Sequence, residues 1–146
     1  VINTVNPTFV RLRSTVPIPG TPLYDMMQKG QWTPLSEVQK VLEIRTFIEH
    51  CNGITSTLQS DHIMNLLEDV EGTFPHDTAA MLSTIDKFLA MEKEDQDKFI
   101  IGRRTGMYRY LSDYYPNFKI DQLYYAIVQH YQNVDTAMLE ILKDYV

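Results

Sequence analysis

The sequence predicts a mostly α-helical protein with one or two short strands, an α+β class. Most of the 146 residues fall into segments whose apolar positions recur every three or four residues and which begin at a capping side chain. Residues 8–15 instead alternate apolar and polar side chains, as a strand does, and residues 54–58 are a weaker second strand candidate.

Composition limits the function classes. Hydrophobic residues make up 44% of the chain, enough for one ordinary core. No apolar run approaches the roughly 20 residues that span a bilayer, and no signal segment starts the chain, so we expect a cytoplasmic protein without membrane contact. The formal charge of −6 argues against nucleic acid as a partner.

The strand predicted at residues 8–15 has two distinct faces. Successive side chains of a strand point to opposite sides, so Phe9, Arg11 and Arg13 share one face while Val10 and Leu12 share the other. Prolines and a glycine at 17–20 then end the strand. Strand, loop and helix start in this order leave backbone N–H groups free, a common place to hold an anion or cofactor.

The helices predicted next have clear start and stop signals. Thr21 caps a helix over 22–29, and Gly30 closes it. The stretch 36–39 is a capping box that begins a second helix, which ends at 52–53. A short helix is expected across 62–69. Asp77 is expected to cap a strongly amphipathic helix.

The C-terminal part changes in composition. The charged stretch 92–98 is interpreted as solvated and as a domain boundary, which separates residues 1–92 from a tyrosine-rich helical region at 93–146. Three helices are expected there, across 105–114, 121–130 and 135–144, the last two capped by aspartate.

Two stretches carry a resemblance to a known family. NPTFVRLRSTVPIPGTPLYDMMQKGQW (6–32) and SDHIMNLLEDVEGTFPHD (60–77) resemble the C-terminal part of radical SAM enzymes of the Elongator-like and anaerobic coproporphyrinogen-oxidase-like group. The resemblance covers about residues 3–92, and more loosely FIIGRRTGMYRYL (99–111).

The resemblance implies that residues 1–92 form the C-terminal edge of a radical SAM (β/α) barrel with its covering helices. Such enzymes hold a [4Fe–4S] cluster on a CxxxCxxC motif and use S-adenosylmethionine. This chain has one cysteine, Cys51, which excludes a cluster site here. We therefore expect a fragment that is inactive alone, whose partner is the rest of its own barrel and whose parent holds both cofactors.

Four residues are candidates for cofactor binding. Arg11 and Arg13 can bind a carboxylate or phosphate through paired hydrogen bonds, and the resemblance places their strand near S-adenosylmethionine and substrate. The alternative is an exposed edge strand with solvated arginines. By resemblance, Gly20 and Thr21 border the adenosine, and the alternative is a plain turn and helix cap.

Four further residues have a substrate or a structural role. His62 and Asn65 are spaced to share a helix face and, with Asp61, could transfer protons, or they could cap a helix and satisfy buried polar groups. Arg103 and Arg104 lie in a stretch interpreted as flexible and basic, which could clamp a phosphate or remain a solvated turn. No catalytic residue and no metal ligand is assigned.

A second hypothesis is a stand-alone helical interaction module, whose exposed tyrosines and arginines would mark a partner surface. A barrel fragment would instead leave an unpaired strand edge at 8–15. We expect that edge to self-associate, to pair with the rest of the barrel or to be covered by helices.

Overall fold

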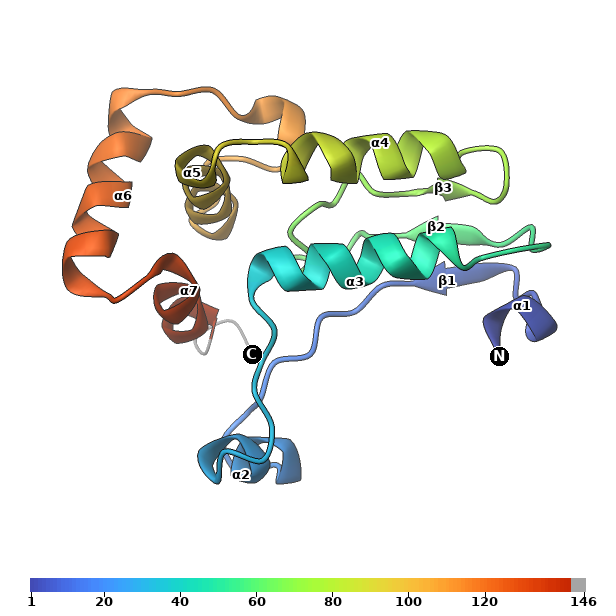
Figure 1. Cartoon of the computed structure of the whole chain (residues 1–146), viewed down its shortest axis with the longest axis horizontal. Coiled ribbons are helices and arrows are strands. Elements are labelled where there is room, and N and C mark those ends of the chain that lie inside the picture. The colour runs from blue at the N-terminus through green and yellow to red at the C-terminus, as the bar shows by residue number, and fades with distance from the viewer. Residues whose placement is uncertain (143–146) are drawn as a thin grey trace.

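The computed structural model describes residues 1–142 and confirms the predicted α+β class (Figure 1). The elements in chain order are α1 (Ile2–Val5), β1 (Phe9–Arg11), α2 (Pro22–Gln28), α3 (Glu37–Glu49), β2 (Thr57–Gln59), β3 (Gly72–Thr73), α4 (Thr78–Leu89), α5 (Lys93–Arg104), the 3-10 turn η1 (Leu111–Asp113), α6 (Phe118–His130) and α7 (Val134–Leu142). The last two residues of the helix predicted at 135–144 lie outside the described residues. In residues 1–142 no helix is long and apolar enough to cross a bilayer.

The sheet has three strands in the order β1-β2-β3, where the sequence predicted one or two. β1 and β2 are parallel, with Phe9 opposite Thr57 and Arg11 opposite Gln59, and β3 pairs antiparallel with β2. Two parallel strands need a crossover connection, and α2 and α3 supply it. The first 59 residues therefore contain one β-α-β unit, in which the regular strand is shorter than the predicted 8–15.

The hydrophobic core lies between the sheet and α3, α4 and α5. Leu58 of β2, Ile48 of α3, and Ile85 and Phe88 of α4 are fully buried. The Phe88 ring packs on Phe99 of α5 with 5.8 Å between ring centroids. The core therefore continues without interruption across residue 93.

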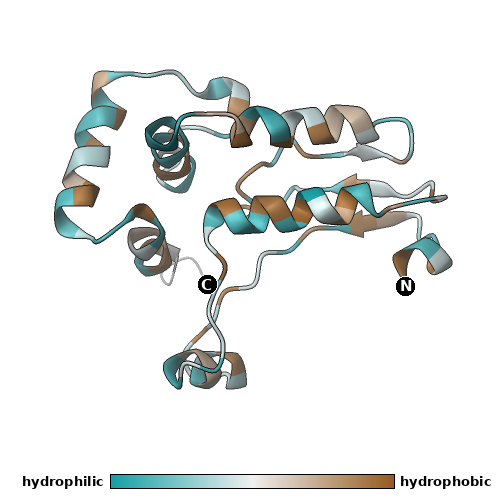
Figure 2. Cartoon of the chain, in the orientation of Figure 1, coloured by the Kyte–Doolittle hydropathy of each residue, from teal (hydrophilic) through white to brown (hydrophobic). Residues whose placement is uncertain are grey.

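Helix α5 is hydrophilic in sequence but central in the fold, and Figure 2 shows it largely in the polar colour. The prediction of a solvated stretch at 92–98 is correct for residues 92–94, which are exposed, and wrong for residues 96–98, which are buried. Lys98 pairs with Glu94 of its own helix and with Asp121 of α6. Buried charged groups are tolerated when they are paired, which explains how so polar a helix packs inside.

Two predicted helices are absent. The residues at 62–69 form turns, because the arginines of α5 hydrogen-bond to the carbonyls of Ile63, Met64 and Asn65. In 105–114 only η1 is helical. Gly106, with φ of +76°, ends α5 there, and the Asp113 carboxylate accepts hydrogen bonds from two backbone amides before it.

The first residues of α2, α3 and α6 lie at or near the predicted positions. Thr21 caps α2, and Ser36 with Gln39 forms the predicted capping box of α3. Helix α6 begins three residues earlier than predicted, because Asn117 rather than Asp121 caps it through the amides of Lys119 and Ile120.

Candidate functional site

The outer face of the sheet is the first candidate site. Phe9, Arg11 and Arg13 are exposed, whereas Val10 and Leu12 are partly buried against the core, as the predicted alternation requires. Phe9 is 56% exposed, which is high for an aromatic side chain in a sheet. The helices thus cover one face of β1 and leave the other to solvent.

Arg11 and Arg13 differ in their partners. Arg11 forms an ion pair with Asp61, and both side chains are 44% exposed. The hydrogen bond from Arg11 lowers the pKa of Asp61, and the nearby charge of Arg13 lowers it further. Within residues 1–142, Arg13 has no ion pair, so its guanidinium remains available to an anionic ligand.

Gly20 and Thr21 are not gathered with the arginines. Figure 1 shows α2 and the loop before it projecting away from the sheet. Gly20 has φ of +85° and open space around it. The Thr21 hydroxyl donates to the Ile18 carbonyl at 2.7 Å and accepts from the Tyr24 amide at 3.3 Å. This geometry is that of a turn and a helix cap.

His62 and Asn65 lie on the loop after β2. The His62 Nδ1 accepts from the Met64 amide at 3.4 Å, a contact inside the turn. Asn65 is 1% exposed; its side chain donates to the Leu12 carbonyl at 3.2 Å and accepts from the Ser14 hydroxyl at 3.1 Å. Asn65 therefore ties the loop to the segment that follows β1.

Arg103 and Arg104 are buried, so the interpretation of a flexible basic turn is wrong. Arg103 binds Glu68 at 3.1 Å. Arg104 binds Glu37 at 2.5 Å and the carbonyls of Ile63 and Met64. Both arginines position the 61–68 loop from inside the protein, where they cannot clamp a phosphate.

Glu37 is the acidic centre of this buried network. Burial alone would raise the pKa of its carboxyl, but the charges of Arg104 and Lys40 outweigh it and lower the pKa. Its backbone N–H also donates to Asp135 at 3.1 Å. Glu37 therefore connects α3 with both α5 and α7.

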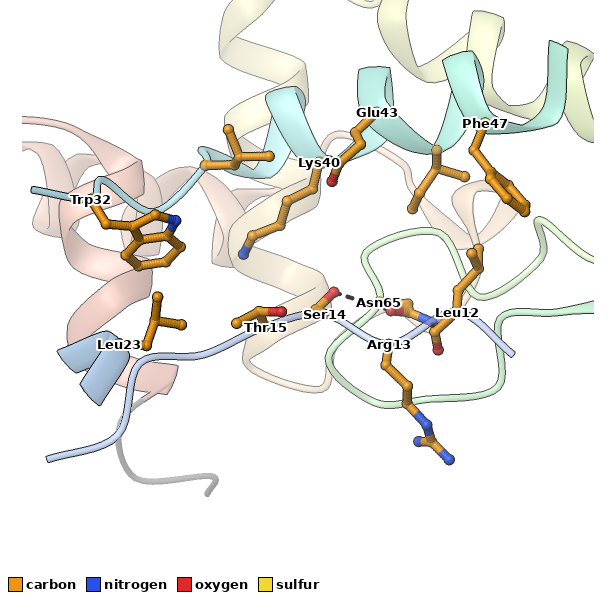
Figure 3. A pocket seen from close by; sticks show the side chains of 12 residues that line it. Leu12, Arg13, Ser14, Thr15, Leu23, Trp32, Lys40, Glu43, Phe47 and Asn65 are labelled. Carbon is orange, nitrogen blue, oxygen red and sulfur yellow. Dashed lines mark hydrogen bonds between the residues drawn. The ribbon is translucent and has the colours of Figure 1, made fainter. Parts of the chain in front are cut away.

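A cavity of about 600 Å³, which no pattern in the sequence predicts, lies between α3 and residues 12–15. Figure 3 shows Trp32, Lys40, Glu43 and Phe47 around it. The available sequence signal was the spacing of Lys40, Glu43 and Phe47 along α3. That spacing places them on neighbouring positions of a helix surface but does not reveal that the chain leaves a gap beneath them.

Comparisons of this chain with protein-family models, with curated proteins and with solved structures returned no match.

Proposed function

We propose that this chain is the C-terminal part of a radical SAM enzyme. It would contribute a barrel strand, a loop on the adenosine side and helices on the substrate side. The supporting observation is the parallel β1–β2 pair, which has helices on one face only and carries Phe9, Arg11 and Arg13 on the open face. In a closed (β/α) barrel one face of every strand is interior and the other is covered by helices.

Radical SAM enzymes use a [4Fe–4S] cluster and S-adenosylmethionine, and the described side chains of this chain suit only the second of these cofactors. Among residues 1–142 no group of three or more His, Cys, Asp or Glu side chains could hold a metal ion, and in the proposed parent enzyme the cluster ligands would lie elsewhere. A carboxylate such as that of S-adenosylmethionine suits Arg13, which has no ion pair among the same residues. The role proposed for this chain is therefore to bind and orient substrate and S-adenosylmethionine and to exclude water, while the bound cofactors supply the radical chemistry.

The test is binding of S-adenosylmethionine by the complete encoded protein, measured by equilibrium dialysis. Arg13→Gln should weaken binding about tenfold, because a charged hydrogen-bond pair to the carboxylate is lost. Lys87→Gln is the control, since Lys87 is an exposed lysine on α4. Absence of binding, or equal affinity in the wild type and Arg13→Gln, would contradict the proposal.

The alternative function is a helical interaction module. It is supported by exposed aromatic side chains in the C-terminal region, where Tyr115 is 64%, Phe118 74% and Tyr125 52% exposed. Aromatic side chains are enriched where proteins bind one another. The self-association experiment in the Discussion distinguishes this surface from the β1 edge.

A further inference from the structure

The cavity beneath α3 has the dimensions and walls of a small-molecule site. Its volume of about 600 Å³ lies within the usual range for ligand pockets. Its walls are mainly apolar and come from separate parts of the chain: Leu12 follows β1, Leu23 lies on α2, Trp32 on the connection, and Ile44 and Phe47 on α3. Trp32 is the chain's one tryptophan, so its fluorescence reports on this cavity.

Lys40 gives the cavity a positive group. Figure 3 shows its side chain reaching from α3 toward the segment of Ser14 and Thr15. Lys40 binds Glu37 at 2.9 Å, but Glu37 also binds Arg104. An ammonium group has three N–H donors, and among residues 1–142 that of Lys40 makes one hydrogen bond, to Glu37, so it can donate to a further anion.

Glu43 limits what the cavity can hold. Its carboxylate lines the same space one helical turn after Lys40. A second negative charge on a ligand would be repelled there, whereas one anionic group near Lys40 and an uncharged ring elsewhere meet no such conflict. Large aromatic and aliphatic walls favour a flat apolar body.

We propose that this cavity binds a flat, apolar small molecule with a single anionic group, the anion at Lys40 and the ring against Trp32 and Leu23. The inference is independent of the radical SAM proposal. Arg13, which the radical SAM proposal uses, also lines the cavity, but Figure 3 shows its guanidinium pointing away from the Lys40 and Glu43 side.

The test uses two matched probes, 1-anilinonaphthalene-8-sulfonate and its uncharged analogue N-phenyl-1-naphthylamine. Titration of the chain, followed by probe emission and by quenching of Trp32, should show saturable one-to-one binding of the sulfonate. Lys40→Met should weaken sulfonate binding about tenfold and leave the uncharged probe unchanged. Lys87→Met, on exposed α4 surface, should change neither.

Glu43→Gln should change the sulfonate affinity in the opposite direction to Lys40→Met. Because Glu43 is exposed, this substitution leaves the fold intact. It should tighten sulfonate binding about threefold, since a repelling charge is removed. Circular dichroism shows whether Lys40→Met folds. If it does not fold, the sulfonate affinity of Glu43→Gln tests the proposal. The proposal is overturned if binding does not saturate, if both probes bind equally, or if neither substitution changes sulfonate affinity in its stated direction.

Discussion

Glu37 is the residue at which three helices meet. It is 3% exposed, binds Lys40 and Arg104 through its carboxylate, and reaches Asp135 through its backbone N–H. A buried charge is stable only while its partners remain, because its desolvation is not otherwise compensated. Replacing both Glu37 and Arg104 by apolar side chains should therefore lower the free energy of unfolding less than replacing one of them alone.

Arg104→Met should lower the free energy of unfolding by about 3 kcal/mol, since it leaves the Glu37 carboxylate buried with Lys40 as its remaining charged partner. Urea denaturation measures the change. The double variant Glu37→Met with Arg104→Met is the control and should recover part of the loss. A single-variant loss below about 1 kcal/mol would show that the pair is not a structural anchor.

The pH dependence of stability should also depend on Glu37. Its pKa is lowered from the ordinary value of 4.5, so the unfolded chain binds the proton more readily than the folded one. Its contribution is complete above the unfolded pKa and is lost as the pH falls through the folded pKa. The stability gap between wild type and Glu37→Gln should thus be constant well above the ordinary pKa of 4.5 and narrow as the pH falls below it. A gap that stays constant as the pH falls would contradict the assignment.

At the scale of elements, the loop at 61–68 is held by tertiary contacts rather than by its own sequence. Asn65 connects it to Leu12 and Ser14, while Arg103 and Arg104 hold its carbonyls. The loop therefore links the end of β1 to α5, and one substitution in it should loosen both attachments.

Asn65→Ala should cost about 1 kcal/mol of unfolding free energy, because it leaves the partly buried Leu12 carbonyl and Ser14 hydroxyl without their partner. Hydrogen exchange by mass spectrometry should show faster exchange in the 61–68 peptide. Gln122→Ala, on the exposed side of α6, serves as the control and should leave that peptide unchanged. Unaltered exchange in Asn65→Ala would show that the arginines alone hold the loop.

Elements set by local chemistry could be predicted, and those set by distant partners could not. Thr21 and the capping box at Ser36 act within one helical turn, so their helices were predicted correctly. The turns at 62–69 depend on contacts about 40 residues away, such as Arg104 to Met64. The buried charges of α5 depend on partners in other helices, Asp121 for Lys98 and Glu37 for Arg104. Periodicity carries no signal for such contacts.

The same distinction between local and distant contacts applies to the candidate site. Strand alternation placed Arg11 and Arg13 on one face but did not decide between a barrel interior and solvent, and the structure shows both side chains exposed. The cavity under α3 was not predictable, because it results from how residues 12–15, α2 and α3 diverge in space. The buried positions of Arg103 and Arg104 were missed because glycines on both sides of them suggest a turn.

At the scale of the molecule, the sheet formed by residues 1–142 ends in β1, whose outer edge pairs with no other strand of these residues. The Leu12 amide and the Thr8 carbonyl bond to β2, so by the alternation of a parallel ladder the backbone groups of Phe9 and Arg11 point to the free edge of β1. An open edge with an exposed aromatic residue pairs readily with another strand.

The chain should therefore self-associate with increasing concentration, and Phe9→Lys should reduce association, since a lysine beside an edge opposes strand pairing. Sedimentation velocity measures it. Phe118→Lys is the matched control, being an exposed aromatic residue on α6. If Phe118→Lys abolished association and Phe9→Lys did not, the interaction-module hypothesis would be favoured. A wild-type chain that stays monomeric would contradict self-association through either surface.

The measurement that tests the central claim most directly is the sequence of the coding DNA upstream of Val1. The radical SAM proposal predicts an in-frame CxxxCxxC motif roughly 150 to 300 residues earlier, about the length of one barrel. A start codon directly before Val1, without such cysteines, would contradict it and leave a free-standing helical protein with one open sheet face.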